Sequence, residues 1–254
     1  MATPEADHAD GKREPVGAAL VVGAGDATGG AIARRFAREG YAACVTRRTA
    51  DKLAPLVERI RAEGGTAHGY ASDARKEDDV VALVERIERE VAPIEVAVFN
   101  IGANVRFGLT ETTARVFTKV WEMACFAGFV AGREAAKHMV PRGRGTILFT
   151  GATASVRGRE GYSAFAAAKH GLRAVAQSMA RELGPEGIHV GHIVIDGGID
   201  GVFVRGLRAN AEELLAESAI LKPEEIAQSY VALHRQGRSA WTHELDVRPW
   251  KESW

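Results

Sequence analysis

The sequence contains no long apolar run and no surplus of either charge. None of its apolar stretches reaches the roughly 18 residues that a membrane-spanning helix requires. The 33 lysines and arginines equal the 33 aspartates and glutamates, whereas nucleic-acid-binding proteins usually show a basic surplus. We therefore expect neither a membrane nor a nucleic acid as a partner. Residues 1–15 are charged and lack the apolar core of a signal peptide, so they are expected to form a loose tail.

Cysteine is nearly absent. The two cysteines, Cys44 and Cys125, lie far apart and form no CxxC pair, which excludes a disulfide-rich secreted scaffold and the common zinc motifs. Reduced, buried thiols in a cytoplasmic protein are expected, and no metal site is expected.

What the sequence does contain is a regular alternation of short apolar runs with longer amphipathic stretches. The predicted strands are 18–22, 42–46, 65–71, 95–99, 145–150, 189–195 and 243–247. Several of these runs are almost entirely apolar, which is typical of strands that are buried on both faces. We expect an α/β fold: a three-layer, doubly wound parallel sheet of the Rossmann type, with about seven strands and helices on both faces. Residues 1–254 are interpreted as a single dinucleotide-binding domain.

Glycines punctuate this pattern. Gly40, Gly64 and Gly184 follow helical runs, where a left-handed C-cap is favoured. The least regular stretch, 196–222, follows a strand, and open α/β sheets bind ligands at the carboxyl ends of their strands. It is interpreted as a substrate loop with a short helix, and a plain surface excursion remains the alternative.

The first predicted strand leads directly into a glycine-rich turn. Gly23, Gly25, Gly29 and Gly30 lie between this strand and a helix that begins near Thr28. Such a turn allows the backbone to approach a pyrophosphate and directs free N–H groups of the helix toward it. A glycine-rich turn alone can also be a tight connection, but its place near the start of the chain favours a dinucleotide site.

The end of the second strand faces the adenosine ribose in a dinucleotide fold. Arg47 and Arg48 follow this strand, and a guanidinium suits the 2′-phosphate of NADP. Asp26 in the glycine turn opposes a phosphate, and one of the two arginines is expected to be solvated only. The balance favours NADP(H) over NAD(H).

These motifs, in this order and spacing, make the sequence resemble the short-chain dehydrogenase/reductase family over about residues 16–250. The family motif TGxxxGxG corresponds to the stretch from Val22 to Gly29, with Ala27 in place of the middle glycine. The resemblance implies that Asp73 contacts adenine. The family's NNAG motif becomes FNIG, which keeps Asn100 and Gly102.

The resemblance extends to the last third of the chain. The family's PG motif becomes Asp196–Gly197, and Ile199 lies where that loop meets the nicotinamide carboxamide. The resemblance also implies a small-molecule substrate and a homo-oligomer, either a dimer or a tetramer.

Most of the family's catalytic side chains are missing. Members of the family use Asn, Ser, Tyr and Lys, and the corresponding positions here hold Ala124, Ala152, Phe165 and Lys169. Alanine and phenylalanine have no polar side-chain group, and phenylalanine cannot act as a general acid. Lys169 keeps one implied role, which is to hold the ribose next to the nicotinamide.

Nearby groups could replace those that are lost. Tyr162 lies seven residues before Lys169 and is the first candidate for the catalytic group, while Thr153 and Ser155 could supply a hydroxyl. His192 lies in a predicted buried strand and is interpreted as a core residue with satisfied hydrogen bonds.

Three functions remain open from the sequence. The first is an NAD(P)-dependent oxidoreductase that acts on a small carbonyl or alcohol through an atypical active site. The second is a catalytically impaired protein that binds the cofactor in a structural or sensing role. The third is a redox-neutral lyase or isomerase that uses the same pocket. No side chain in the sequence identifies the substrate.

Overall fold

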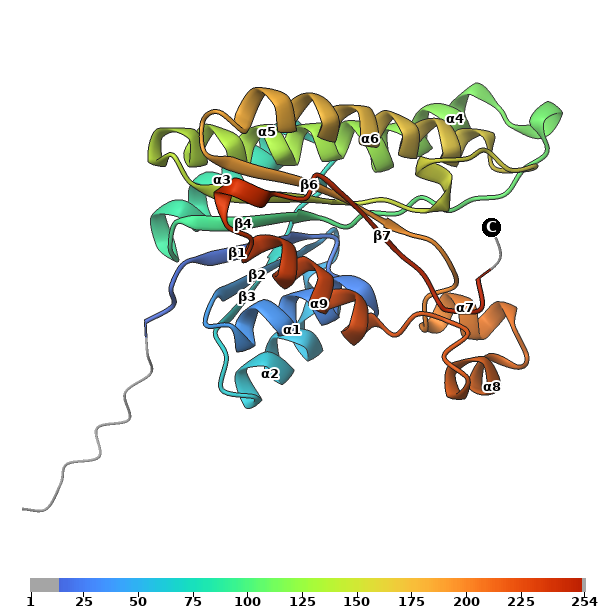
Figure 1. Cartoon of the computed structure of the whole chain (residues 1–254), viewed down its shortest axis with the longest axis horizontal. Helices are drawn as coiled ribbons and strands as arrows, with labels where there is room; N and C mark the ends of the chain where they lie inside the picture. The colour runs from blue at the N-terminus through green and yellow to red at the C-terminus, as the bar shows by residue number, and fades with distance from the viewer. Residues whose placement is uncertain (1–13, 253–254) are drawn as a thin grey trace, which may run out of the picture.

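The computed structural model describes residues 14–252, which form a seven-stranded sheet between two layers of helices (Figure 1). The strand order is β3-β2-β1-β4-β5-β6-β7, and neighbouring strands are parallel. The strands are β1 (Ala18–Val22), β2 (Ala42–Arg47), β3 (Ala67–Ala71), β4 (Ile94–Phe99), β5 (Gly145–Thr150), β6 (Ile188–Ile195) and β7 (Glu244–Val247). Each begins and ends within two residues of its prediction, and the expected doubly wound fold is confirmed. Most of the expected N-terminal tail, residues 1–13, lies outside the described residues.

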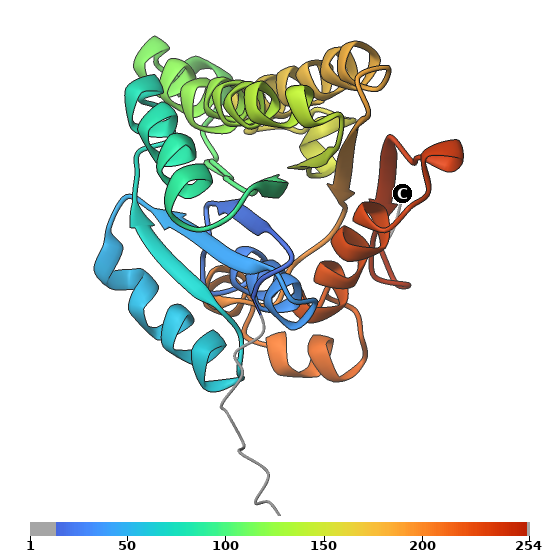
Figure 2. The same ribbon diagram turned by 90° about the vertical axis from the view of Figure 1, so that its left-hand side faces the viewer.

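Helices cover both faces of the sheet, as Figures 1 and 2 show. One layer consists of α1 (Thr28–Arg38), α2 (Ala54–Ala62) and α9 (Pro223–His234). The other consists of α3 (Glu77–Glu90), α4 (Ala114–Trp121), α5 (Ala127–Met139) and α6 (Ser163–Leu183). One π-helical turn, Glu122–Phe126, joins α4 to α5 without a break, so these elements together form the long helix expected around 111–140.

The side chains of β1 show how the sheet is buried on both faces. Leu20 and Val22 pack into the cluster under α3, α5 and α6, whereas Ala19 and Val21 pack into the cluster under α1 and α9. Because successive side chains of a strand point to opposite faces, a strand buried on both sides needs an unbroken apolar run. This requirement explains why the apolar runs of the sequence predicted the strands so closely.

Two of the three expected left-handed glycines are confirmed. Gly40 and Gly64 have φ of 92° and 83° directly after α1 and α2. The prediction for Gly184 is wrong, because its φ of −57° is helical. The chain continues for one more turn, and Gly187, with φ of 83°, takes the left-handed conformation instead.

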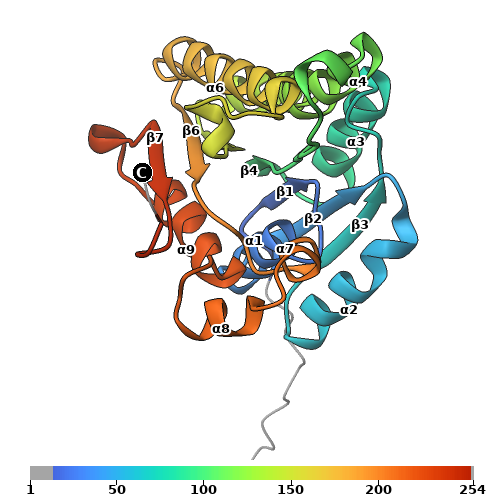
Figure 3. The ribbon, with the colours of Figure 1, turned by 90° about the vertical axis from the view of Figure 1, so that its right-hand side faces the viewer.

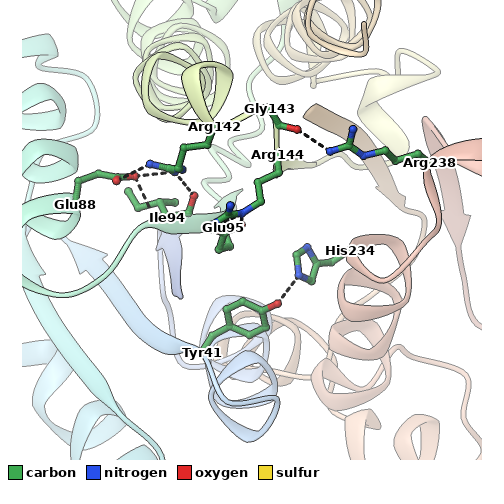
Figure 4. A network of polar contacts seen from close by, with 9 residues as sticks. All are labelled: Tyr41, Glu88, Ile94, Glu95, Arg142, Gly143, Arg144, His234 and Arg238. Atoms are coloured by element: carbon green, nitrogen blue, oxygen red, sulfur yellow. Dashed lines mark hydrogen bonds and ion pairs between the residues drawn. The ribbon is translucent and has the colours of Figure 1, made fainter. Parts of the chain in front are cut away.

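A polar network ties the elements together at the amino-terminal edge of the sheet (Figure 4). Arg142, which precedes β5, donates to Glu88 of α3 at 2.7 Å and to the carbonyl of Ile94 at 2.9 Å. Tyr41 and His234 meet at 2.7 Å between the start of β2 and the end of α9. These contacts fix the edge opposite to the one that carries the expected site.

The carboxyl-terminal edge of the sheet is the other end of the molecule (Figure 3). There the segment 196–222 forms two short helices, α7 (Val202–Leu207) and α8 (Ala211–Ala216), where one was expected. The segment is closed on itself, because Asp200 N–H donates to the Leu221 carbonyl at 2.8 Å. The first residues of this segment lie close to the turn between β1 and α1. A Cβ atom added to Gly201 would lie 3.1 Å from the Cβ atom of Ala27. In residues 14–252, no helix has the length and apolar character to cross a bilayer.

Candidate functional site

The glycine turn after β1 forms a tight cradle against the end of β4. The Asn100 amide donates to the Gly23 carbonyl at 3.1 Å. A Cβ added to Gly29, the second residue of α1, would lie 2.4 Å from that carbonyl oxygen and 2.8 Å from the Asn100 amide nitrogen. Only glycine fits this position, because the backbone approach leaves no room for a side chain. No side chain caps the start of α1, and the Gly30 N–H donates to the Gly25 carbonyl at 2.9 Å. Among the described residues, the amides of Thr28 and Gly29 remain available to an anion.

A groove of about 180 Å³ opens beside this cradle, between the ends of β2 and β3. We call it the β2–β3 groove; its lining residues are Gly23, Thr46, Arg47, Arg48, Ser72, Asp73, Ala74, Arg75, Ile101, Gly102 and Met123. The groove therefore brings together five of the residues predicted to bind a dinucleotide, namely Gly23, Arg47, Arg48, Asp73 and Gly102.

The two arginines after β2 differ in their contacts. Arg47 donates to the Asp26 carboxylate at 3.1 Å and to the Lys52 carbonyl at 3.4 Å. Asp26 is thereby neutralised by a neighbour and does not face the groove as an isolated charge. Arg48 has no ion-pair or hydrogen-bond partner among residues 14–252, so its guanidinium remains available to a ligand.

Asp73 is held by an arginine that the sequence reasoning did not single out. Arg75 donates to both carboxylate oxygens of Asp73, at 2.9 Å and 2.5 Å. This bond from the Arg75 guanidinium keeps the pKa of Asp73 below its ordinary value. Three arginines thus line one side of the groove. Arg75 lies only two residues after Asp73, so the local sequence could have indicated this ion pair.

Lys169 is buried at the carboxyl edge of the sheet. Its ammonium donates to the Thr150 carbonyl at the end of β5 (2.8 Å) and to the Ile101 carbonyl after β4 (3.1 Å). Burial lowers the pKa of Lys169 to about 8, an effect that the nearby Cys125 thiol opposes. An ammonium has three N–H donors, so one remains for a further acceptor.

The other three positions of the expected tetrad surround Lys169 with apolar groups. Phe165 lies one turn earlier on α6, with its ring centroid 6.0 Å from the Lys169 nitrogen. Ala124 is fully buried in the π-helical turn, and π turns of this kind are frequent at functional sites. Ala152 lies two residues after the end of β5 and is half-buried. No side chain at these three positions can hydrogen-bond to a substrate.

The hydroxyl groups considered as replacements differ in accessibility. Ser155 is fully buried and accepts the Ala152 N–H at 3.1 Å, so its hydroxyl serves the turn and cannot reach a substrate. Thr153 is half-buried and donates to the Asp196 carboxylate at 2.5 Å. Tyr162 is the N-cap residue of α6, half-buried against the apolar cluster around Phe165, and its hydroxyl has no bonded partner within residues 14–252.

Asp196 is a buried carboxylate that the sequence reasoning identified only as a departure from the PG motif. Besides Thr153 it faces two guanidiniums, those of Arg157 and Arg248, each at 3.6 Å. Thr153 and Arg157 belong to the connection between β5 and α6, whereas Arg248 follows β7, so the cluster joins three segments of the chain. Such a cluster leaves no local pattern in the sequence, and only the fold shows it.

Comparison with known proteins identifies the family of the chain. Residues 17–212 match the sequence model of the family described as short chain dehydrogenase, which is more than half of the chain. The chain belongs to the short-chain dehydrogenase/reductase family. It is therefore an NAD(P)-dependent oxidoreductase by family.

Individual relatives agree with this assignment. The 2-dehydro-3-deoxy-D-gluconate 5-dehydrogenase of Formosa agariphila is 33% identical over 69% of this chain and 67% of its own. The cis-4-hydroxycyclohexanecarboxylate dehydrogenase of Sinomonas cyclohexanicum is 30% identical over 85% of this chain and 88% of its own. Among solved structures, a short-chain dehydrogenase from Rhodopseudomonas palustris is 48% identical, with a TM-score of 0.78 over 93% of this chain and 100% of that one.

The cradle of this short-chain dehydrogenase/reductase fits a dinucleotide. The Thr28 and Gly29 amides have no partner in the described part of the chain, and neither does the Arg48 guanidinium in the groove. Lys169 has one N–H donor to spare. Ile199 lies at the other end, where it forms an isolated parallel bridge with Leu221 at the base of segment 196–222. Thr28 is buried as the first residue of α1, and a Cβ at Gly25 would meet no protein atom within 4 Å. No group of three or more candidate metal ligands occurs among residues 14–252.

Gly29→Ala is expected to destabilise the protein even without cofactor. The new methyl group would overlap the Gly23 carbonyl and the Asn100 amide, so the turn between β1 and α1 must shift. We expect a loss of about 2 kcal/mol or more in the free energy of unfolding, together with weaker NADPH binding. Gly25→Ala is the matched control, and it should unfold like the wild type in urea. Equal stability of the two variants would contradict the close contact of the Gly29 backbone with the Gly23 carbonyl and the Asn100 amide.

A second buried polar cluster lies behind Lys169, between α6 and β7. The His192 Nδ1–H donates to the Glu244 carboxylate at 3.0 Å, and the Arg173 guanidinium donates two further hydrogen bonds to the same carboxylate, each 2.6 Å long. The other ring nitrogen of His192 is buried without a hydrogen-bond partner in the described chain, so the expected satisfied core histidine is only half satisfied. Burial lowers the pKa of His192 to about 4.

This histidine is expected to make the protein sensitive to acid. His192 stays neutral in the folded state down to about pH 4 but takes up a proton near pH 6.5 when unfolded. The contribution of His192 to the free energy of unfolding is therefore fully present above pH 6.5. It is lost as the pH falls toward 4, and the loss reaches about 3 kcal/mol. Urea unfolding at a series of pH values should show this slope, and His192→Gln should reduce it. The exposed His170 offers the control: His170→Gln should leave the slope unchanged, and an unchanged slope in His192→Gln would disprove the assignment.

Proposed function

We propose that this protein is an NADP(H)-dependent oxidoreductase that interconverts a small carbonyl compound and its alcohol. The observation that carries the proposal is Lys169, which is buried between the Thr150 and Ile101 carbonyls with one N–H donor to spare at the cofactor edge. A buried ammonium with an open donor is costly unless a ligand accepts from it. The ribose next to the nicotinamide is the acceptor that we assign to it.

The proposed cofactor is NADP(H), and Arg48 in the β2–β3 groove supports this choice, because the neighbouring Arg47 and Arg75 are ion-paired with Asp26 and Asp73. Arg48 has no partner in residues 14–252, and the pairing of Asp26 with Arg47 removes the main objection to a phosphate. Arginine is the residue best suited to a 2′-phosphate, because its planar fork presents several donors.

The proposed chemistry uses few side chains. A bound nicotinamide supplies or accepts the hydride. Lys169 holds the ribose. Thr153, the accessible hydroxyl next to Ala152, accepts a hydrogen bond from a substrate alcohol, and it must turn its O–H away from Asp196 to donate to a substrate carbonyl. Tyr162 remains the proposed source of the proton: it is the N-cap residue of α6, three residues before Phe165, and packs against the same apolar cluster. The names of two relatives support a small alcohol as substrate, since one acts on a 2-dehydro-3-deoxygluconate and the other on a hydroxycyclohexanecarboxylate.

Two measurements in sequence test this function. Titration of nicotinamide fluorescence gives the affinity for NADPH and NADH, and a panel of small carbonyl compounds then gives turnover. We expect binding with slow, measurable reduction. Tight binding without reduction of any carbonyl would replace this function with the second candidate below, and absence of nicotinamide binding would favour a redox-neutral lyase or isomerase.

The second candidate is a protein that binds the cofactor but hardly turns over. Ala124, Ala152 and Phe165 favour it, because three positions that normally act on substrate carry no polar group. A general acid usually contributes about 10²- to 10⁴-fold to the rate, so its loss alone could reduce turnover to a trace.

We also propose that the protein forms a homodimer or homotetramer. Phe117, Trp121 and Phe129 on α4 and α5 are each about 40% exposed, at 41%, 40% and 37%. Large aromatic side chains in one exposed helical layer are typical of subunit interfaces. Light scattering at micromolar concentration should give a mass of two or four chains. A monomer in that measurement would refute the proposal, and Phe117→Glu with Trp121→Glu should shift an oligomer toward the monomer.

A further inference from the structure

A second, larger cavity of about 400 Å³ lies at the amino end of α6. We call it the α6 cavity; it is lined by Arg106, Gly108, Leu109, Arg159, Glu160, Gly161 and Ser163. Two segments form its walls, one following β4 and the other preceding α6. They are held together by the Phe107 N–H, which donates to the Gly161 carbonyl at 2.9 Å. A volume of this size is ample for a small-molecule substrate.

The two guanidiniums of the α6 cavity have no partner in the part of the chain that the structure describes. Most described arginines form ion pairs, for example Arg142 with Glu88 and Arg144 with Glu95. Arg106 and Arg159 have neither an ion pair nor a hydrogen bond within residues 14–252, although Glu160 lies in the same wall. The cavity therefore presents two free arginines and one glutamate, an excess of one positive charge.

We propose that the α6 cavity binds the carboxylate of the substrate, so that the protein acts on a small oxo or hydroxy monocarboxylic acid. The proposal rests on the function proposed above. The guanidinium fork matches the two oxygens of a carboxylate and gives strong charge-assisted hydrogen bonds. One excess positive charge balances a monocarboxylate, whereas a phosphate ester carries nearly two negative charges.

The position of the cavity along α6 suits this role. Ser163 in its wall lies two residues before Phe165 and six before Lys169 on the same helix. At 1.5 Å per residue, these separations correspond to about 3 Å and about 9 Å along the helix axis. Val105 and Tyr162, the sequence neighbours of Arg106 and Gly161 in the cavity wall, pack against the apolar cluster around Phe165. A small oxo acid can therefore place its carboxylate in the cavity while its carbonyl lies near Phe165.

Turnover supplies the first test, with levulinate and its neutral methyl ester as probes. In Arg106→Gln with Arg159→Gln, kcat/KM for levulinate should fall by about 10- to 100-fold. The value for methyl levulinate should change by less than about threefold, because the ester has no carboxylate to lose. Glu160→Gln should raise kcat/KM for levulinate. Arg115 is also exposed, lies outside the cavity and has no ion pair within residues 14–252. Arg115→Gln is therefore the matched control and should change neither value.

Binding supplies the second test, which does not depend on turnover. Calorimetry of the protein saturated with NADP⁺ measures levulinate affinity, since the oxidised cofactor cannot reduce the ketone. We expect the double variant to bind levulinate about 10- to 100-fold more weakly than the wild type. Circular dichroism melting curves should show that the variants remain folded, because both arginines are exposed.

The outcomes separate this proposal from the function on which it rests. Levulinate binding that is absent, or equal in wild type and double variant, would overturn the carboxylate site whether or not any carbonyl is reduced. Tighter binding of dihydroxyacetone phosphate than of levulinate would assign the cavity to phosphate esters and would also overturn it. Arginine-dependent levulinate binding without reduction of any carbonyl would leave the site standing and defeat the redox function.

Discussion

Phe165→Tyr combined with Ala152→Ser is expected to raise the rate of carbonyl reduction by about 10²- to 10⁴-fold over the wild type. The Phe165 ring lies 6.0 Å from the Lys169 nitrogen, so an added hydroxyl would lie near this cation. A nearby positive charge lowers the pKa of a phenol and makes it a better acid–base group near neutral pH. The measurement is the initial rate of NADPH oxidation with a panel of small ketones.

The single variants should show that the two groups act together. Phe165→Tyr alone should give a gain of about tenfold or less, because Ala152 still provides no hydrogen bond to the substrate oxygen. The combined gain should exceed the product of the single gains, since both hydroxyls serve one proton transfer. Phe129→Tyr adds the same hydroxyl on the exposed face of α5 and should leave the rate unchanged.

The opposite result would relocate the acid. If the wild type already reduces a ketone rapidly and Phe165→Tyr slows it, another group supplies the proton. Tyr162→Phe and Thr153→Val then distinguish the two remaining hydroxyls, because each removes one of them with little change in volume. If neither variant is slower, both candidates are eliminated and a water-mediated route remains.

Arg48→Ala is expected to remove most of the preference for NADPH over NADH. Its guanidinium has no partner in residues 14–252, whereas Arg47 is occupied by Asp26 and by the Lys52 carbonyl. A hydrogen bond to a charged group contributes about 1.5 to 3 kcal/mol, so NADPH affinity should fall by about 10- to 100-fold while NADH affinity is retained. Fluorescence titration of both cofactors measures the ratio.

Arg47→Ala and Arg115→Ala serve as controls for this prediction. Arg47→Ala should have a smaller effect, and Arg115→Ala, outside the groove, should have none. If wild-type protein binds NADH as tightly as NADPH, the phosphate argument fails and Asp26 was the better guide to cofactor choice.

The fold was predictable because burial on both faces imposes a pattern on the sequence. A central parallel strand such as β1 must be apolar throughout, and its run ends where the backbone leaves the sheet. The glycine turn was equally readable, since the contact of Gly29 with the Gly23 carbonyl tolerates no side chain. The two short helices of segment 196–222 were not resolved in the sequence, because elements of six residues carry too little periodicity.

The site was less predictable, because its contacts join distant segments. Arg47 and Arg48 are adjacent and identical in type, so only the fold shows that one is occupied and the other free. The bond between Thr153 and Asp196 spans 43 residues and has no local signature. Arg106 and Arg159 likewise come from separate loops, and the sequence reasoning passed over both.

The central claim is that this scaffold still transfers a hydride although it lacks the family's tyrosine. The most direct test uses NADPH that carries deuterium at the transferable position, with small ketones and oxo acids as acceptors and mass spectrometry of the products. We predict deuterium at the former carbonyl carbon of the product, with less transfer in Lys169→Met because the ribose loses its donor. Saturating NADPH binding without deuterium in any product would contradict the claim.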